Sequence, residues 1–139
     1  MLFPEMMYNR RMKRIYFWYS KKSLDWWSIP HFLFGVVIAL SALVFAWSVP
    51  VAFVATFAIA LLWEYFERHV RIRETPANSK MDILLPLLAF ILTIFLMNHT
   101  PSQTAQDRQS FLIIALSLYG FVNFIAWRAK IEHDREFQG

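Results

Sequence analysis

The sequence contains no cysteine and very little glycine. None of the 139 residues is cysteine, and only three are glycine. The chain therefore has no disulfide scaffold, no thiolate metal ligand and no glycine-rich loop that would cradle a phosphate. The HExxH and GxSxG motifs of metalloproteases and α/β-hydrolases are also absent. These absences exclude the enzyme classes that a short motif most often reveals.

Charge is scarce as well. Charged residues make up 17% of the chain, against roughly 25% in soluble domains. Apolar and aromatic residues make up 58%, and the mean hydropathy is +0.38. The net charge of +4 does not indicate nucleic-acid binding, because the basic residues flank apolar runs and do not form a stripe. The composition predicts a single transmembrane domain over residues 1–139.

Three long stretches carry no Asp, Glu, Lys or Arg: residues 26–63, 83–106 and 109–127. At about 1.5 Å per residue, one helix over the first stretch would be almost twice as long as the roughly 30 Å hydrocarbon core. The chain must therefore turn back, and Pro50 marks the place, since the residue before a proline avoids the α region. Strand alternation is absent. The pattern predicts an all-α bundle of four transmembrane helices, at about residues 29–47, 50–69, 79–97 and 109–128.

The basic residues predict the orientation of these helices. Of the 14 Lys and Arg residues, Arg108 alone lies on one side; the others precede the first helix, flank the loop between the second and third, or follow the fourth. Positive charge gathers on the cytoplasmic side, so both termini should lie in the cytoplasm and the helices in the plasma (inner) membrane. Residues 6–22 mix basic, apolar and aromatic side chains, which is typical of a helix lying on the cytoplasmic leaflet. For residues 1–10 a disordered basic tail fits equally well.

Six polar side chains are predicted to lie at one level, near the cytoplasmic ends of three helices. They are His31, Glu64, Glu67, Asn78, Ser79 and Asp82. Polar groups inside a membrane are costly and are therefore functional candidates. A histidine and carboxylates in one place suit acid–base chemistry or a divalent cation. Pro86 has no N–H to donate to the carbonyl of Asp82, so we expect this carbonyl to point into the same cavity.

The polar residues of the first two helices can also be explained by structural roles alone. His31 fits an interfacial histidine that bonds a headgroup or a backbone carbonyl. Glu64 and Glu67 each precede an arginine by four residues, Arg68 and Arg71, which is the favourable order for an ion pair on a helix surface. Such pairing alone would explain Glu67. Glu64 lies deeper than its arginine, where burial demands a partner.

The third helix and the remaining polar residues have structural interpretations too. Ser79 and Asp82 fit the N-cap and third position of a capping box that starts a helix. Gly35, one turn after His31, fits a close approach of another helix or of a substrate, or a small packing residue, and packing is favoured. Residues 98–108 are expected to form a solvated loop. The polar residues of the last helix are expected to form hydrogen bonds between helices: Ser117, Tyr119 and Asn123.

The polar residues also follow a recognisable order. The chain carries His31 and Gly35, then WEYFE at 63–67, then Arg71 or Arg73, and then NSKMD at 78–82. This order, which covers about residues 29–97, resembles the VanZ-like family of small polytopic bacterial membrane proteins. The resemblance implies an inner-membrane protein linked to the cell envelope, with a polar cluster on the cytoplasmic side.

These observations lead to two functional hypotheses. The first is an envelope protein that binds the polar, anionic headgroup of a membrane lipid in a pocket formed by His31, Glu64 and Asp82. Further binding residues around this pocket and at its rim are expected to be Glu67, Arg68, Arg71, Arg73, Asn78 and Ser79. The sequence leaves open whether the chain is an enzyme; if so, Glu64 or His31 is the acid–base group, and Asp82 holds a divalent cation or orients the histidine. The second hypothesis is an accessory or assembly subunit whose partner is a larger membrane protein complex.

Overall fold

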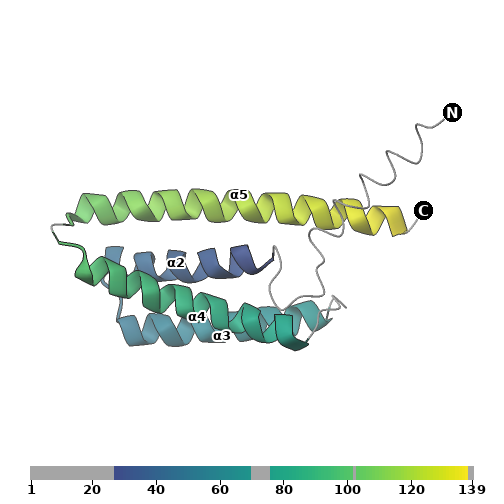
Figure 1. Ribbon diagram of the computed structural model, residues 1–139, viewed down its shortest axis with the longest axis horizontal. Coiled ribbons are helices and arrows are strands. Elements are labelled where there is room, and N and C mark those ends of the chain that lie inside the picture. Colours follow the sequence, from purple (N-terminus) through teal and green to yellow (C-terminus); the bar gives the residue numbers. More distant parts are fainter. Residues whose placement is uncertain (1–26, 70–75, 102, 138–139) are drawn as a thin grey trace.

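The computed structural model describes residues 27–69, 76–101 and 103–137. This part of the chain forms four helices: α2 (Ser28–Val44), α3 (Val49–His69), α4 (Pro76–His99) and α5 (Ala105–Phe137). They run alternately in opposite directions, so that the start of α2, the end of α3 and the start of α4 lie at the same end of the bundle (Figure 1). The predicted all-helical architecture is confirmed. The predicted interfacial helix at 6–22 lies outside the described residues.

Three of these helices are long and apolar enough to cross a membrane. They are α3, α4 and the part of α5 that spans Ala105–Ala129. Their outward faces carry most of the large exposed apolar side chains, among them Val54, Leu62, Leu88, Ile113 and Phe121. The fourth helix, α2, is apolar but has only 17 residues, a length of about 25 Å at the α-helical rise.

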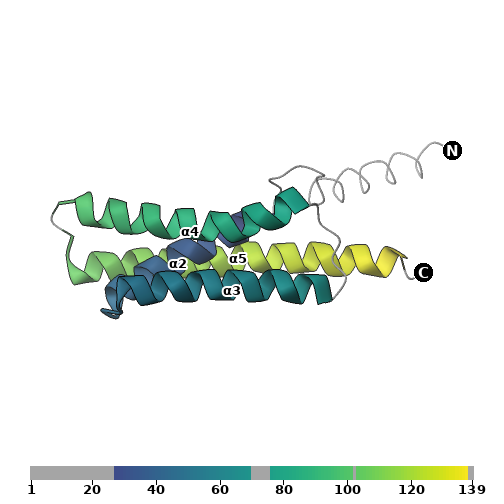
Figure 2. The ribbon, with the colours of Figure 1, turned by 90° about the horizontal axis from the view of Figure 1, so that it is seen from below.

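α2 is the central helix of the bundle. Figure 1 shows it between α5 on one side and the pair α3 and α4 on the other, and Figure 2 shows it between α4 and α3. Its backbone is a close neighbour of all three, and α3 is also a neighbour of α4. Among the described helices, the backbone of α5 has α2 as its one close neighbour. The apolar core therefore forms around α2, with Val37 and Leu40 on one face and Ala39 and Ala42 on another.

Gly35 of α2 packs directly against the backbone of Pro86 in α4. A Cβ atom added to Gly35 would lie 2.0 Å from the carbonyl oxygen of Pro86, far inside the van der Waals limit. Only glycine permits this approach, because it has no Cβ. The predicted packing role of Gly35 is confirmed, and the predicted third helix accommodates Pro86 in its interior.

α2 ends three residues before the predicted boundary at residue 47. The chain leaves the helix at Ala46, whose φ of 51° is left-handed. The N–H of Trp47 donates to the carbonyl of Ala42 at 2.9 Å, and the N–H of Phe45 donates to Ser41. The bond from Trp47 is the 6→1 bond of a Schellman motif, which usually has glycine where this chain has alanine. The missing glycine explains why the sequence pattern did not reveal this end.

The last two helices begin earlier than predicted. α4 begins at Pro76, where a proline costs nothing because the first N–H groups of a helix have no intrahelical partner. The predicted capping box of Ser79 and Asp82 is therefore wrong: both residues lie inside the helix. A real capping box starts α5 within the predicted loop. Thr104 and Asp107 exchange hydrogen bonds of 2.8 Å from the Thr104 N–H and 3.1 Å from the Asp107 N–H.

Candidate functional site

The crossing of α2 and α4 brings His31 and Asp82 together. The two helices run in the same direction (Figure 1), and they touch where Gly35 meets Pro86. His31 is one turn before Gly35 in α2, and Asp82 is one turn before Pro86 in α4. The two side chains therefore leave matching positions of a closely packed pair. Glu64 joins them from α3, which ends at the same end of the bundle.

Asp82 is almost completely buried and is held by donors from two helices. Only 1% of the residue is exposed. The side-chain amide of Asn78 donates to Oδ2 at 2.8 Å, and the hydroxyl of Ser28 donates to Oδ1 at 3.4 Å. Asn78 lies one turn earlier in α4, whereas Ser28 is the first residue of α2. These contacts fix the carboxylate next to His31.

The two glutamates of α3 are buried as well, but they have different neighbours. Glu64 is 3% exposed and accepts a hydrogen bond from the hydroxyl of Ser79 in α4. Glu67 accepts a hydrogen bond of 2.8 Å from the indole N–H of Trp63. The predicted surface pair of Glu64 and Arg68 is not formed, since Arg68 is exposed and makes no ion pair with any described residue. Glu64 points into the bundle instead.

His31, Glu64 and Asp82 form the most compact group of potential ligands in the described part of the chain. One ligand atom from each side chain lies within 4.8 Å of the other two. His31 is 9% exposed, and no residue within 27–69, 76–101 or 103–129 forms a hydrogen bond with its imidazole. One imidazole nitrogen and two carboxylates at this spacing suit a metal ion or a shared proton. The predicted convergence of the three residues is confirmed, and their chemical role stays a prediction.

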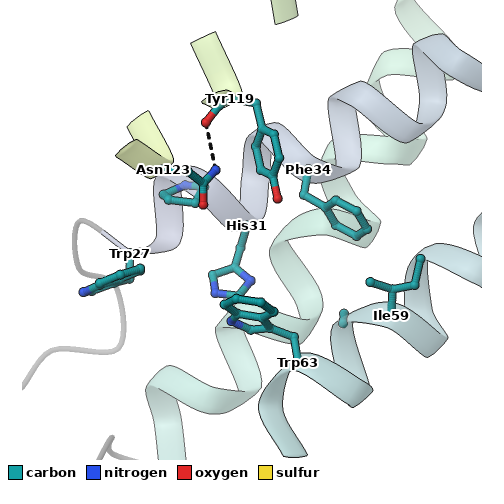
Figure 3. Close-up of a pocket in the computed structure, with 9 residues that line it drawn as sticks. Trp27, His31, Phe34, Ile59, Trp63, Tyr119 and Asn123 are labelled. Carbon is teal, nitrogen blue, oxygen red and sulfur yellow. Dashed lines mark hydrogen bonds between the residues drawn. The ribbon is translucent and has the colours of Figure 1, made fainter. Parts of the chain in front are cut away.

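A cavity of about 70 Å³ lies beside this group. We call it the His31 cavity. Its walls come from α2, α3 and α5 and from the residue before α2: Trp27, Pro30, His31, Phe34, Ile59, Ala60, Trp63, Tyr119 and Asn123. Figure 3 shows the side chains of His31, Trp63 and Tyr119 converging on it. His31 lines the cavity and also belongs to the ligand group.

Of the three residues predicted to form one pocket, His31 lines this cavity. Neither Glu64 nor Asp82 lines the His31 cavity. Their carboxylates turn toward hydroxyl and amide donors of α2 and α4, because buried acids need such partners. Of the arginines expected at the rim, Arg68 is exposed and does not line the cavity, and Arg71 and Arg73 lie outside the described residues.

Aromatic rings connect the helix ends next to the cavity. Trp127 of α5 contacts Trp27 and Trp63 edge to face, with ring centroids 6.2 and 6.5 Å apart. This geometry is favourable for aromatic pairs. Deeper in the bundle, Tyr119 packs against Phe34 at 6.4 Å. Side chains thus link α5 to α3 and α2 around the cavity.

Two cavity residues, Tyr119 and Asn123, were predicted to form hydrogen bonds between helices, as was Ser117. The side-chain amide of Asn123 donates to the carbonyl of Tyr119 at 2.8 Å (Figure 3), and the hydroxyl of Ser117 donates to Ile113 at 2.8 Å. Both bonds stay within α5, so the predicted hydrogen bonds between helices are wrong. Residues 119, 123 and 127 are spaced by four, which places them on one face of the helix. This spacing is the signal that would have marked them as a group.

The comparisons with known proteins add no relative to this picture. No protein-family model, no curated protein and no solved structure matches the chain.

Proposed function

We propose that this chain is a multi-pass protein of the plasma (inner) membrane that binds the polar headgroup of a membrane lipid in the His31 cavity. The observation that supports the proposal is the mixed lining of a cavity beside buried polar residues. His31, Tyr119 and Asn123 offer polar groups, whereas Phe34 and Ile59 offer apolar walls. A lining of this kind favours an amphipathic ligand.

The size of the cavity limits what enters it. A volume of about 70 Å³ holds a few atoms, such as the end of a headgroup, and excludes a whole lipid. Acyl chains would lie against the apolar outer faces of α3 and α5, which carry exposed residues such as Leu62, Phe121 and Phe124. The small polar end of a lipid would therefore fit the cavity, and its long apolar chains would fit the apolar surface around the cavity.

The position of the cavity along the helices supports the same ligand class. Tryptophan rings gather at the level where a membrane meets water, and Trp27, Trp63 and Trp127 surround this end of the bundle. Nearly all basic residues precede α2, follow α3 or follow the span of α5, so this end is proposed to face the cytoplasm, with both termini. Arg68 would then lie near the headgroups of the inner leaflet and favour an anionic lipid. The resemblance of the residue order to that of the VanZ-like family supports the proposed role in the cell envelope.

The proposal is tested by filling the cavity. Ala60 lines it and is buried, so Ala60→Leu places a larger side chain in the space of the ligand. Ala58→Leu on the exposed face of α3 is the matched control. Both variants and the parent chain are purified from the membrane into nanodiscs of mixed zwitterionic and anionic lipid, and retained lipid is measured by native mass spectrometry.

We expect the parent chain and Ala58→Leu to retain one lipid class, and Ala60→Leu to lose it. Equal lipid retention in all three proteins would contradict the proposal. Purification of all three in one stable complex with another membrane protein, with no retained lipid class, would also contradict it and would favour the accessory subunit.

A further inference from the structure

The ligand group of His31, Glu64 and Asp82 has the composition of a metal site. It combines one imidazole with two carboxylates, all three on different helices and all three buried. Two carboxylates this close repel each other, and a bound divalent cation removes the repulsion. The imidazole has no hydrogen-bond donor or acceptor among the described residues to compete for its nitrogen. We propose that these three residues bind one divalent transition-metal ion, for which Zn²⁺ is the reference.

The choice of ion follows from the donor atoms. Mg²⁺ and Ca²⁺ prefer shells made entirely of oxygen, whereas an imidazole nitrogen favours Zn²⁺ and other first-row transition metals. Three protein ligands with one open position are the usual arrangement of a zinc ion that meets a further ligand. The chain has no cysteine, so a thiolate site cannot compete for the same ion.

The spacing of the ligand atoms is compatible with this ion. Bonds of 2.0–2.1 Å in a tetrahedral zinc site place neighbouring ligand atoms about 3.3 Å apart. The three ligand atoms lie within 4.8 Å of one another, so small shifts of the three side chains toward the ion would close the remaining gap. The hydrogen bonds from Ser28 and Asn78 to Asp82 would then serve as the outer shell that orients a ligand.

Because His31 lines the cavity as well, an ion bound here would lie next to the proposed headgroup site. The position of the ion next to a bound headgroup rests on the proposed function, whereas metal binding itself does not. The test therefore uses the full chain in a detergent that carries no phosphate and with no phospholipid added. Failure of metal binding and failure of lipid retention then appear in separate experiments.

The experiment measures Zn²⁺ affinity by competition with a chromophoric chelator, followed by Co²⁺ substitution and visible absorption. The test variants are His31→Gln and Asp82→Asn, which keep size and polarity. The matched controls are His99→Gln and Asp107→Asn, since His99 bonds the carbonyl of Phe95 and Asp107 belongs to the capping box of α5. His99 is the last residue of α4 and Asp107 lies in the first turn of α5, and these two helix ends lie at the other end of the bundle (Figure 1).

We expect one Zn²⁺ per chain, with Mg²⁺ and Ca²⁺ unable to displace it. Loss of an outer-shell contact typically weakens metal binding by about 10–100-fold, so each test variant should weaken it by at least about 100-fold. The controls should stay within about threefold of the parent chain. Equal affinity in the parent and test variants would overturn the inference. If a test variant does not fold, thermal unfolding of the parent chain decides: Zn²⁺ should raise its Tm, and an unchanged Tm at saturating Zn²⁺ would overturn the inference.

Discussion

Replacement of Gly35 by alanine tests the contact on which the whole site depends. The new Cβ would lie 2.0 Å from the carbonyl oxygen of Pro86 and 2.8 Å from its Cα. Ordinary contacts between carbon and a carbonyl oxygen begin at about 3.3 Å, so α2 and α4 must separate by roughly 1 Å or more. Both sides of the contact are backbone, and no side chain can rotate away. We therefore expect a cost near the upper end of the range for overpacking, about 3 kcal/mol of unfolding free energy.

The same separation should weaken the metal site. His31 and Asp82 lie one turn from the two residues in contact, so a shift of the helices moves the imidazole and the carboxylate apart. We expect Zn²⁺ affinity to fall by about tenfold or more. Unfolding is measured by SDS titration in mixed micelles with circular dichroism, and affinity by chelator competition.

Gly120→Ala is the matched control, because a Cβ at this position of α5 meets nothing within 4 Å. Helix propensity alone should make this variant more stable than the parent chain by up to about 1 kcal/mol. The reasoning is refuted if Gly35→Ala also matches or exceeds the stability of the parent chain and keeps its Zn²⁺ affinity.

Two further predictions concern residues at other helix ends, and a third concerns the pH dependence of metal binding. Ala46→Gly should raise the unfolding free energy by about 0.5–1 kcal/mol in the same titration, because glycine adopts the left-handed conformation of this residue without strain; a loss of stability would count against the Schellman end. Thr104→Ala should lower it by about 1 kcal/mol through loss of the capping box with Asp107, whereas Thr100→Ala, whose hydroxyl bonds the carbonyl of Leu96 near the end of α4, should have a smaller effect. Zn²⁺ affinity should fall steadily as the pH is lowered, because protons compete for the imidazole and both carboxylates; an affinity independent of pH in the acid range would argue against these ligands.

Most of the helical architecture could be predicted, because it follows from where charge is absent. The stretches without charge determined the number and order of the helices that the structure describes. The ends of the helices were harder to predict than their number and order. Ala46 takes a conformation that glycine normally marks, and Pro76 begins a helix three residues before a serine with a more obvious cap pattern. The cap of α5 was readable in Thr104 and Asp107, but it lay in a stretch whose polar composition favoured a loop.

The candidate site could be predicted in part, because topology alone places three helix ends together. His31, Glu64 and Asp82 converge as that topology requires. The cavity could not be predicted, since it depends on how α5 is rotated about its axis. That rotation brings Tyr119 and Asn123 to the cavity, and it is set by packing of residues far apart in the sequence. The orientation of the carboxylates likewise depends on donors supplied by other helices.

Among the described helices, α2 alone is a close backbone neighbour of α5, and this has a consequence for access to the cavity. Outward tilting of this helix breaks one helix–helix interface and the ring contacts of Trp127, while the packing among α2, α3 and α4 stays intact. Such a tilt widens the gap in which Tyr119 and Asn123 face α3. The proposed lipid ligand would then enter sideways from the bilayer, without first leaving the membrane for water.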